Sequence, residues 1–212
     1  MVQPKMVYIS NPTEVGTIYS KAELTALSET CHKYGLYLFL DGARLGYGLA
    51  APDNDLTLPE IAALCDVFYI GGTKVGALFG EAVVIKNPEL AQDFRYLIKQ
   101  NGGMLAKGRL LGLQFDALFT DGLYQEISAH AIAMAEKLRE AFTAKGYNYL
   151  APNRTNQIFV IVPDAHLAKI SEQFEYSYDQ RIDATHSCVR FCTSWATKEE
   201  NVDALIRCVE KL

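Results

Sequence analysis

Two short runs of almost uninterrupted apolar residues set the strongest limit on how this chain can fold. They are LYLFLD, residues 36–41, and DVFYIG, residues 66–71. Strands with apolar residues on both faces are typical of sheets that are covered on both sides, as in α/β proteins. Helical patterns over residues 20–34 and 58–65 alternate with these runs. The sequence therefore predicts an open α/β sheet.

Two further segments extend the predicted sheet. KMVYIS, residues 5–10, precedes the first helical pattern, and EAVVIK, residues 81–86, closely follows DVFYIG. The connection between DVFYIG and EAVVIK is too short for a helical crossover, so this pair is expected to be antiparallel. The glycine-rich segment GARLGYGLA, residues 42–50, is predicted to be a loop, and residues 88–100 are predicted to be a helix.

The pattern changes in the second half of the chain. Residues 126–145 form an amphipathic helix with one apolar stripe, made of Ile127, Ala131, Met134, Leu138 and Phe142. After Gly146, strands are predicted at 156–163 and 188–194, and helices at 165–174 and 197–212. We therefore predict a large domain over residues 1–125, followed by a connector helix and a small α+β domain over residues 126–212.

Composition excludes several classes of function. The chain has 25 acidic and 20 basic residues, a formal net charge of −5, which does not suit a nucleic-acid binder. Its five cysteines form no CxxC pair and its four histidines are scattered, so neither a disulfide scaffold nor a metal site is expected. No apolar run is long enough for a membrane span. A cytoplasmic protein without a nucleic-acid or membrane partner is predicted.

Three polar residues stand at the ends of predicted strands or inside them. Asp41 ends LYLFLD, Lys74 follows DVFYIG in the turn GGTK, and Arg190 lies in CVRFCTS, residues 188–194. Ligands of open α/β sheets bind beyond the carboxyl ends of the strands. Asp41 and Lys74 are therefore expected to face one cleft.

These residue types have complementary chemistry toward pyridoxal 5′-phosphate and an amino acid. A lysine in a partly dry cleft has a lowered pKa and attacks aldehydes. A carboxylate stabilises a protonated pyridine nitrogen, and an arginine binds a substrate carboxylate through two parallel hydrogen bonds. Ordinary roles remain open as well: Lys74 as a solvated loop residue, Asp41 as a turn cap, and Arg190 as the ion-pair partner of Glu199 or Glu200.

Four segments taken together resemble the threonine aldolase and aromatic amino acid β-eliminating lyase family of fold-type-I pyridoxal phosphate enzymes. They are TEVGTIYSKAEL, LFLDGARLG, the GGTK segment and VRFCTSWATKEENVDAL, in the order in which the family has them. The resemblance implies that Lys74 binds the cofactor aldehyde and that Asp41 pairs with the pyridine nitrogen. It implies that Arg44 and Arg190 hold the substrate carboxylate, and that Thr73 touches the cofactor phosphate.

The resemblance also implies a reaction, a fold and an assembly. The family cleaves β-hydroxy-α-amino acids to glycine and an aldehyde, in homodimers or homotetramers. The chain would be part of a fold-type-I transferase-like large domain with a smaller C-terminal α+β domain. The family's phosphate-binding turn and ring-stacking histidine would precede the TEVGT segment. The 212 residues alone are therefore expected to be a poor catalyst. A β-eliminating lyase, an aminotransferase and a non-catalytic structural or dimerisation fragment remain alternatives.

Overall fold

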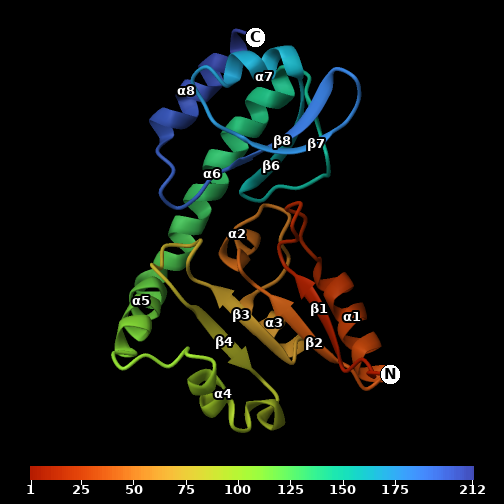
Figure 1. The fold of residues 1–212 in the computed structure, drawn as a ribbon, viewed down its shortest axis with the longest axis vertical. Helices are drawn as coiled ribbons and strands as arrows, with labels where there is room; N and C mark the ends of the chain where they lie inside the picture. Colours follow the sequence, from red (N-terminus) through yellow and green to blue (C-terminus); the bar gives the residue numbers. More distant parts are fainter.

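The predicted strands of the first half lie side by side in one four-stranded sheet, in the order β1-β2-β3-β4. The structure is a computed structural model that describes residues 1–212 (Figure 1). The parallel strands are β1 (Met6–Ser10), β2 (Tyr37–Asp41) and β3 (Val67–Gly71), and the fourth is β4 (Glu81–Ile85). β4 is antiparallel to β3. The open sheet and its antiparallel last pair are thus confirmed.

One face of this sheet is buried and the other is partly open. Leu38, Leu40 and Phe68 on the buried face are at most 3% exposed. On the opposite face Tyr8 is 54% exposed, and its ring stacks on Phe39 with centroids 5.4 Å apart. The prediction that the strands are buried on both faces is therefore wrong for this chain.

Capping boxes start the two helices next to the parallel strands. In α1 (Lys21–Lys33), Ser20 caps the backbone N–H of Glu23, and the Glu23 carboxylate accepts from the Ser20 N–H at 2.9 Å. The box before α3 (Leu58–Leu64) uses Thr57 and Glu60 in the same way. Each box satisfies backbone donors that a helix start leaves unpaired. Both helices begin within a residue or so of the predicted positions, as local sequence patterns allow.

Two predicted segments differ in the structure. The predicted loop at residues 42–50 contains a short helix, α2 (Leu45–Leu49), despite its two glycines. The predicted helix at 88–100 is divided into η1 (Pro88–Ala91) and α4 (Phe94–Gln100) by Asp93, which has a positive φ of 56°. Packing explains α2: its Tyr47 is 1% exposed, and a Cβ at Gly46 would lie 2.5 Å from the Ser128 hydroxyl. Tertiary contacts override weak helix propensity here.

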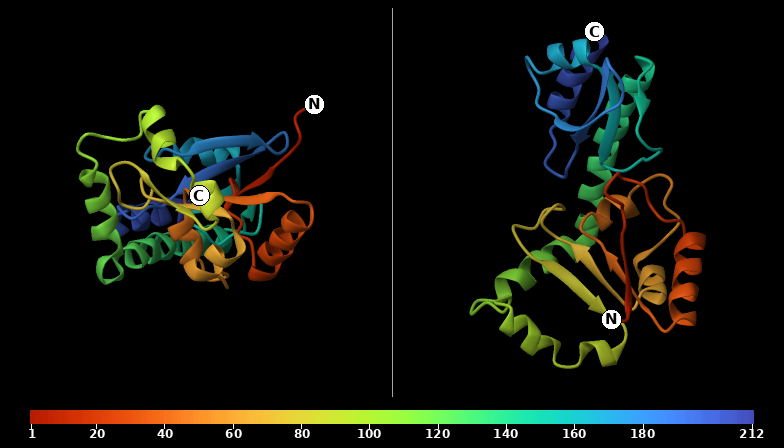
Figure 2. Two further views of the ribbon diagram at one scale, coloured as in Figure 1. Left: turned by 90° about the horizontal axis from the view of Figure 1, so that it is seen from below. Right: turned by 45° about the vertical axis from the view of Figure 1, so that its right-hand side comes forward.

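A long helix joins the two halves of the molecule. α5 (Arg109–Phe119) leads through η2 (Thr120–Gly122) into α6 (Leu123–Ala144), which runs from the first sheet up into the second unit (Figures 1 and 2). The predicted apolar stripe of α6 is buried from Ala131 to Phe142, and Ile127 is half-buried. Each half of the molecule has its own hydrophobic core, and α6 contributes to both. Ile132 is its last residue in the core of the first half, and Met134 is its first residue in the core of the second half. None of the helices has the length and apolar character that a membrane crossing requires.

The second unit is an antiparallel sheet packed on helices, in the order β5-β6-β8-β7. Its strands are β5 (Asn148–Tyr149), β6 (Gln157–Pro163), β7 (Ser177–Arg181) and β8 (His186–Cys192). The helices α7 (Asp164–Ile170) and α8 (Glu199–Glu210) complete it together with the end of α6. The two longest strands and both helices are where the sequence predicted them, whereas β5 and β7 were not predicted.

Tyr124→Phe is expected to destabilise the junction between α6 and the first sheet. The buried Tyr124 hydroxyl donates to the Gly71 carbonyl at 3.0 Å and accepts from the Gly46 N–H at 3.1 Å. Its removal leaves two buried backbone groups unpaired, which costs roughly 2–4 kcal/mol. Urea unfolding measures this loss, with Tyr96→Phe as the control because Tyr96 is 75% exposed. Equal midpoints for the two variants would contradict the assigned role of the hydroxyl.

Candidate active site

Asp41 and Lys74 lie at the carboxyl ends of neighbouring parallel strands, as predicted. Asp41 is the last residue of β2, and Lys74 lies in the turn after β3. The backbones approach too closely here for side chains: a Cβ at Gly42 would be 1.9 Å from the Tyr69 carbonyl, and one at Gly71 would be 2.3 Å from the Ala43 carbonyl. The glycines therefore bring the aspartate turn and the lysine turn against each other.

The Asp41 carboxylate is held by donors on both oxygens. Its Oδ2 accepts from the Tyr8 hydroxyl, and its Oδ1 accepts from the Ala43 N–H at 2.9 Å. Burial alone would raise the pKa of Asp41, but the Tyr69 and Tyr8 hydroxyls, the Ala43 amide and the Lys74 ammonium together lower it. Asp41 is therefore ionised at neutral pH and suited to stabilise a proton on a ligand nitrogen.

Tyr8 and Tyr69 are site residues that sequence reasoning missed. Burial, followed by the hydrogen bond to Asp41, raises the pKa of Tyr69 well above its usual value. The Asp41 bond is the largest cause of the raised pKa of Tyr8. Both tyrosines therefore stay protonated and donate to the carboxylate. Their place on the Asp41 face follows from the register of β1 with β2 and of β2 with β3, for which the sequence has no local signal.

Lys74 is exposed to solvent instead of lying in a dry cleft. Its charge acts on two carboxylates, since it contributes to lowering the pKa of Asp41 and opposes the burial that raises the pKa of Glu81. Its backbone carbonyl accepts from the Tyr47 hydroxyl. The backbone of the lysine turn is thus held by α2, while the amine remains accessible.

Thr73 is oriented by Glu81. The Thr73 hydroxyl donates to Glu81 Oε1 at 3.4 Å, and the Gly72 N–H donates to Glu81 Oε2 at 2.9 Å. The hydroxyl predicted to contact a phosphate therefore points at a carboxylate. Its contact with a phosphate stays a prediction.

Arg44 and Arg190 come from different halves of the chain, and the charge of each acts on the Cys192 thiol. Arg44 immediately precedes α2 and Arg190 lies in β8. Burial raises the pKa of the Cys192 thiol, and both guanidinium groups oppose that rise. The Trp195 N–H also donates to the Tyr47 hydroxyl at 3.3 Å, which joins the second unit to the first. This contact places the segment after β8 beside Tyr47, whose hydroxyl also donates to the Lys74 carbonyl.

The ion-pair alternative for Arg190 is wrong. Glu199 pairs with Lys137, and Glu200 lies 3.7 Å from the Lys198 amine. Arg190 instead donates through Nη1 to Gln157 at 3.2 Å. Its Nε is buried and has no hydrogen-bond partner.

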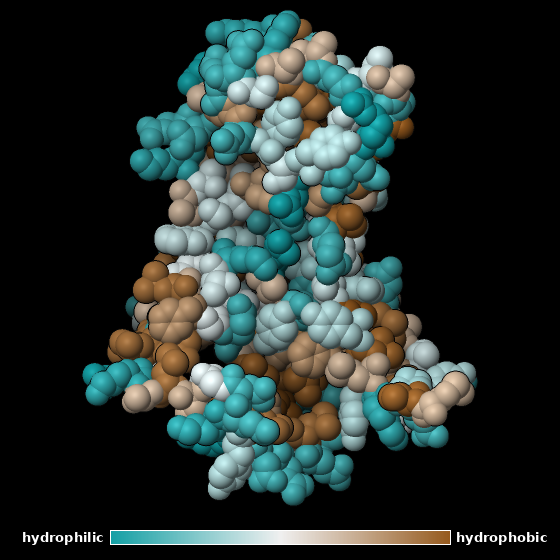
Figure 3. All heavy atoms as spheres, in the orientation of Figure 1, coloured by the Kyte–Doolittle hydropathy of each residue, from teal (hydrophilic) through white to brown (hydrophobic).

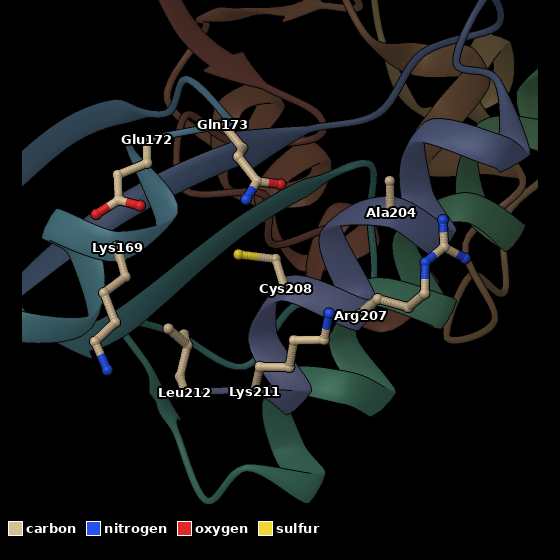
Figure 4. A pocket seen from close by; sticks show the side chains of 8 residues that line it. All are labelled: Lys169, Glu172, Gln173, Ala204, Arg207, Cys208, Lys211 and Leu212. Atoms are coloured by element: carbon tan, nitrogen blue, oxygen red, sulfur yellow. The ribbon is translucent and has the colours of Figure 1, made fainter.

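A large cavity in the second unit is lined by none of the predicted site residues. A cavity of about 490 Å³ lies between α7 and α8 and is lined by Lys169, Glu172, Arg207 and Lys211 among others (Figure 4). Both helices lie at the end of the second unit that is remote from the first sheet (Figure 1). The candidate site is therefore the region around Asp41, Lys74 and the two arginines.

Known proteins resemble the chain over almost all of its length. The family model described as beta-eliminating lyase matches residues 1–165. A low specificity L-threonine aldolase of Pseudomonas sp. is 33% identical over 207 residues, which are 96% of this chain and 58% of that protein. The same-named protein of Pseudomonas aeruginosa is 32% identical over 206 residues, covering 97% of this chain and 59% of the relative. The chain thus spans little more than half the length of these relatives.

Solved structures of similar proteins point to the same family. The Leishmania major threonine aldolase superposes with a TM-score of 0.97 at 45% identity, over 100% of this chain and 62% of that one. An aspartate aminotransferase of Thermus thermophilus has a TM-score of 0.69 at 18% identity, over 98% of this chain and 57% of that one, which is a likeness of fold alone. The fold is thus that of the fold-type-I enzymes, and the chain belongs to the beta-eliminating lyase family.

Proposed function

We propose that this chain carries the lysine, aspartate and arginines of a pyridoxal 5′-phosphate-dependent lyase of the aldolase type. Its reaction is the cleavage of a β-hydroxy-α-amino acid to glycine and an aldehyde. The observation that carries the proposal is the approach of an accessible Lys74 and an ionised Asp41 at adjacent strand ends. In this proposal residues 1–125 belong to the cofactor-binding domain, and residues 126–212 are the connector helix and small domain.

The residues present fit two ends of the cofactor and one end of the substrate. The exposed amine of Lys74 suits an aldehyde, and the ionised Asp41 suits a protonated pyridine nitrogen. The unpaired Nε of Arg190 is a donor that suits a carboxylate. The pairing of Thr73 with Glu81 favours the phosphate less, since a carboxylate beside it repels an anion. Thr73 is therefore the weakest of the proposed cofactor contacts.

Each residue has one task in the proposed reaction. Pyridoxal 5′-phosphate, when bound, supplies an electron sink for the electron pair of the bond that breaks. Asp41 would keep the proton on the ring nitrogen, and Lys74 is the amine that would hold the cofactor through its aldehyde. Arg44 and Arg190 hold the substrate carboxylate and thereby fix its rotation, which decides which bond at Cα is cleaved.

Reduction of the cofactor–lysine bond tests the proposal directly. The chain is titrated with pyridoxal 5′-phosphate, reduced with borohydride and mapped by peptide mass spectrometry. The same procedure is applied to a protein with the full length of the relatives. A pyridoxyl group on Lys74, and not on the exposed Lys99, is expected in the longer protein. Labelling spread evenly over surface lysines in both proteins would refute the assignment of Lys74.

A β-eliminating reaction is the second candidate, favoured by the description of the matching family model. The products separate the two reactions. Aldol cleavage of L-threonine releases glycine and acetaldehyde, whereas elimination from an amino acid with a leaving group releases ammonia and a keto acid. Aminotransfer would instead convert an added keto acid to its amino acid. A folded longer protein that bound no cofactor would support a structural fragment in place of any enzyme.

The proposed assembly is a homodimer or homotetramer. Apolar side chains are exposed around α4 and α5: Leu78 is 86%, Leu113 57% and Leu110 50% exposed. Figure 3 shows these apolar surfaces in brown over α5 and around a hollow in the lower half of the molecule. That hollow beside β4 has a volume of about 830 Å³ and is lined partly by Phe94, Ile98 and Phe115. Exposed patches of this kind mark interaction surfaces.

Light scattering tests whether a second copy covers this surface. A mass of at least twice 23.5 kDa is expected for the chain, and Leu113→Glu is expected to shift it toward a single copy. Gln173→Glu, on an exposed glutamine of the second unit, adds the same charge away from this surface and is the control. A single copy for the unaltered chain would reject the assembly.

We further propose the cytoplasm as the compartment, since five cysteines without a disulfide suit a reducing environment.

A further inference from the structure

Gln157 is a fully buried polar residue beside Arg190, at the start of β6. It is 0% exposed, although glutamine is seldom buried completely. Its Oε1 accepts from Arg190 Nη1 at 3.2 Å, and its Nε2 donates to the Glu14 carbonyl at 3.3 Å. Glu14 belongs to the TEVGT segment between β1 and α1. One side chain thus links the first unit of the molecule to the arginine of the second.

The two partners determine the orientation of the Gln157 amide. A guanidinium group can only donate, so it requires the amide oxygen, and a backbone carbonyl can only accept, so it requires the amide nitrogen. A flipped amide would lose both bonds. The amide therefore has one orientation, which in turn directs one edge of the Arg190 guanidinium.

The other groups around Arg190 leave part of the guanidinium free. Its Nη2 is 3.5 Å from the Ser177 hydroxyl, and its Cζ lies 6.0 Å from the centre of the Phe159 ring. Its Nε is buried without a partner, and the residue lines a hollow of about 320 Å³ together with Cys192. Glu175 lines the same hollow but forms no ion pair with Arg190. The hydrogen-bond partners of the guanidinium are neutral, so they hold it in place without neutralising its charge.

We infer that Gln157 is a positioning residue, which orients the Arg190 guanidinium and keeps its charge available for the carboxylate of an amino acid. The neutral amide is essential to this role. A glutamate in its place would form an ion pair with Arg190 and compete with the carboxylate ligand. An apolar residue of similar size would leave the guanidinium free to turn. The inference rests on the proposed function for the identity of the ligand.

Arginine side-chain NMR on the chain tests the positioning without any cofactor. The Nε–H signal of Arg190, assigned with Arg190→Lys, reports its surroundings, and the exchange of its Nη protons reports rotation. Gln157→Met is expected to shift the Nε–H signal and to speed the rotation. Gln157→Glu is expected to slow the rotation. Unchanged Arg190 signals in a folded Gln157→Met variant would overturn the inference.

Titration with glycine tests the role of charge. Binding of glycine, followed at the Arg190 Nε–H signal, is expected to weaken on the order of tenfold or more in Gln157→Glu, and by a smaller factor in Gln157→Met. Gln173→Glu, on an exposed glutamine with no hydrogen bond to Arg190, controls for added charge. Equal weakening in the two Gln157 variants would overturn the charge argument. If glycine does not bind even to a protein with the full length of the relatives, the proposed ligand is wrong, and the unliganded spectra alone decide the positioning.

Discussion

Lys74→Ala is expected to abolish the borohydride-stable pyridoxyl adduct and to lower threonine cleavage by a factor of roughly 10³ or more, the scale seen when a covalent nucleophile is removed. The physical reason is that no other amine lies at the end of β3, opposite the ionised carboxylate of Asp41. The measurement is made on a protein with the full length of the relatives, of which this chain covers 58% and 59%. Adduct formation is read by mass spectrometry and cleavage by aldehyde release.

Two further variants make this result specific. Lys74→Arg keeps the positive charge near Asp41 and Glu81 but cannot bond covalently to an aldehyde, so it is expected to be as inactive as Lys74→Ala. Lys99→Ala removes an exposed lysine on α4 and is expected to leave the adduct and the activity unchanged. Substantial activity in Lys74→Arg would mean that Lys74 contributes only its charge, and the assignment of a covalent role would fail.

Gly42→Ala is expected to cause the largest loss of stability, about 3–5 kcal/mol, because overpacking against a rigid backbone cannot relax by a side-chain movement. The added methyl group would lie 1.9 Å from the Tyr69 carbonyl oxygen in β3. To accommodate it, the turn after β2 has to move away from β3, which breaks the 2.9 Å bond from the Gly71 N–H to the Gly42 carbonyl. Urea unfolding followed by circular dichroism measures the loss.

Gly112→Ala is the matched control for this substitution. Gly112 lies in α5, and a Cβ at this position meets no atom within 4 Å. Alanine there is expected to be neutral or to stabilise by up to about 1 kcal/mol, because glycine is the poorer helix former. A Gly42→Ala variant as stable as the unaltered chain would show that the two strand ends can separate without cost. The close approach of the turns that carry Asp41 and Lys74 would then lose its explanation.

Much of the first sheet follows from local patterns in the sequence. LYLFLD and DVFYIG are apolar enough to require burial, and each is followed by a turn that contains glycine. Parallel pairing of such strands brings their carboxyl ends to one edge, which is why Asp41 and Lys74 could be predicted to lie together. The apolar stripe of α6 was also predictable from a local pattern, because apolar residues with a period of 3.6 mark one face of a helix.

The features that sequence reasoning missed depend on contacts between distant segments. The glycines of α2 argue against a helix, and the packing of Tyr47 and Gly46 against α6 and its neighbours outweighs that preference. Every residue of β7 is exposed, so this strand has no burial pattern to predict it, and its pairing with β8 defines it. Local propensity is a weak force, and tertiary packing decides such cases.

The sequence by itself determined which residues are candidates for the site, and the tertiary structure decided their surroundings. Residue type and strand position made Asp41 and Lys74 candidates, and the resemblance to the family selected them. The donors on Asp41, Tyr8 and Tyr69, come from neighbouring strands and depend on strand register, which no local pattern encodes. Gln157 reaches Arg190 because β6 pairs with β8, and it reaches the TEVGT segment only because the two units are packed together. Charges and hydrogen-bond partners act over distances in space, and folding alone sets those distances.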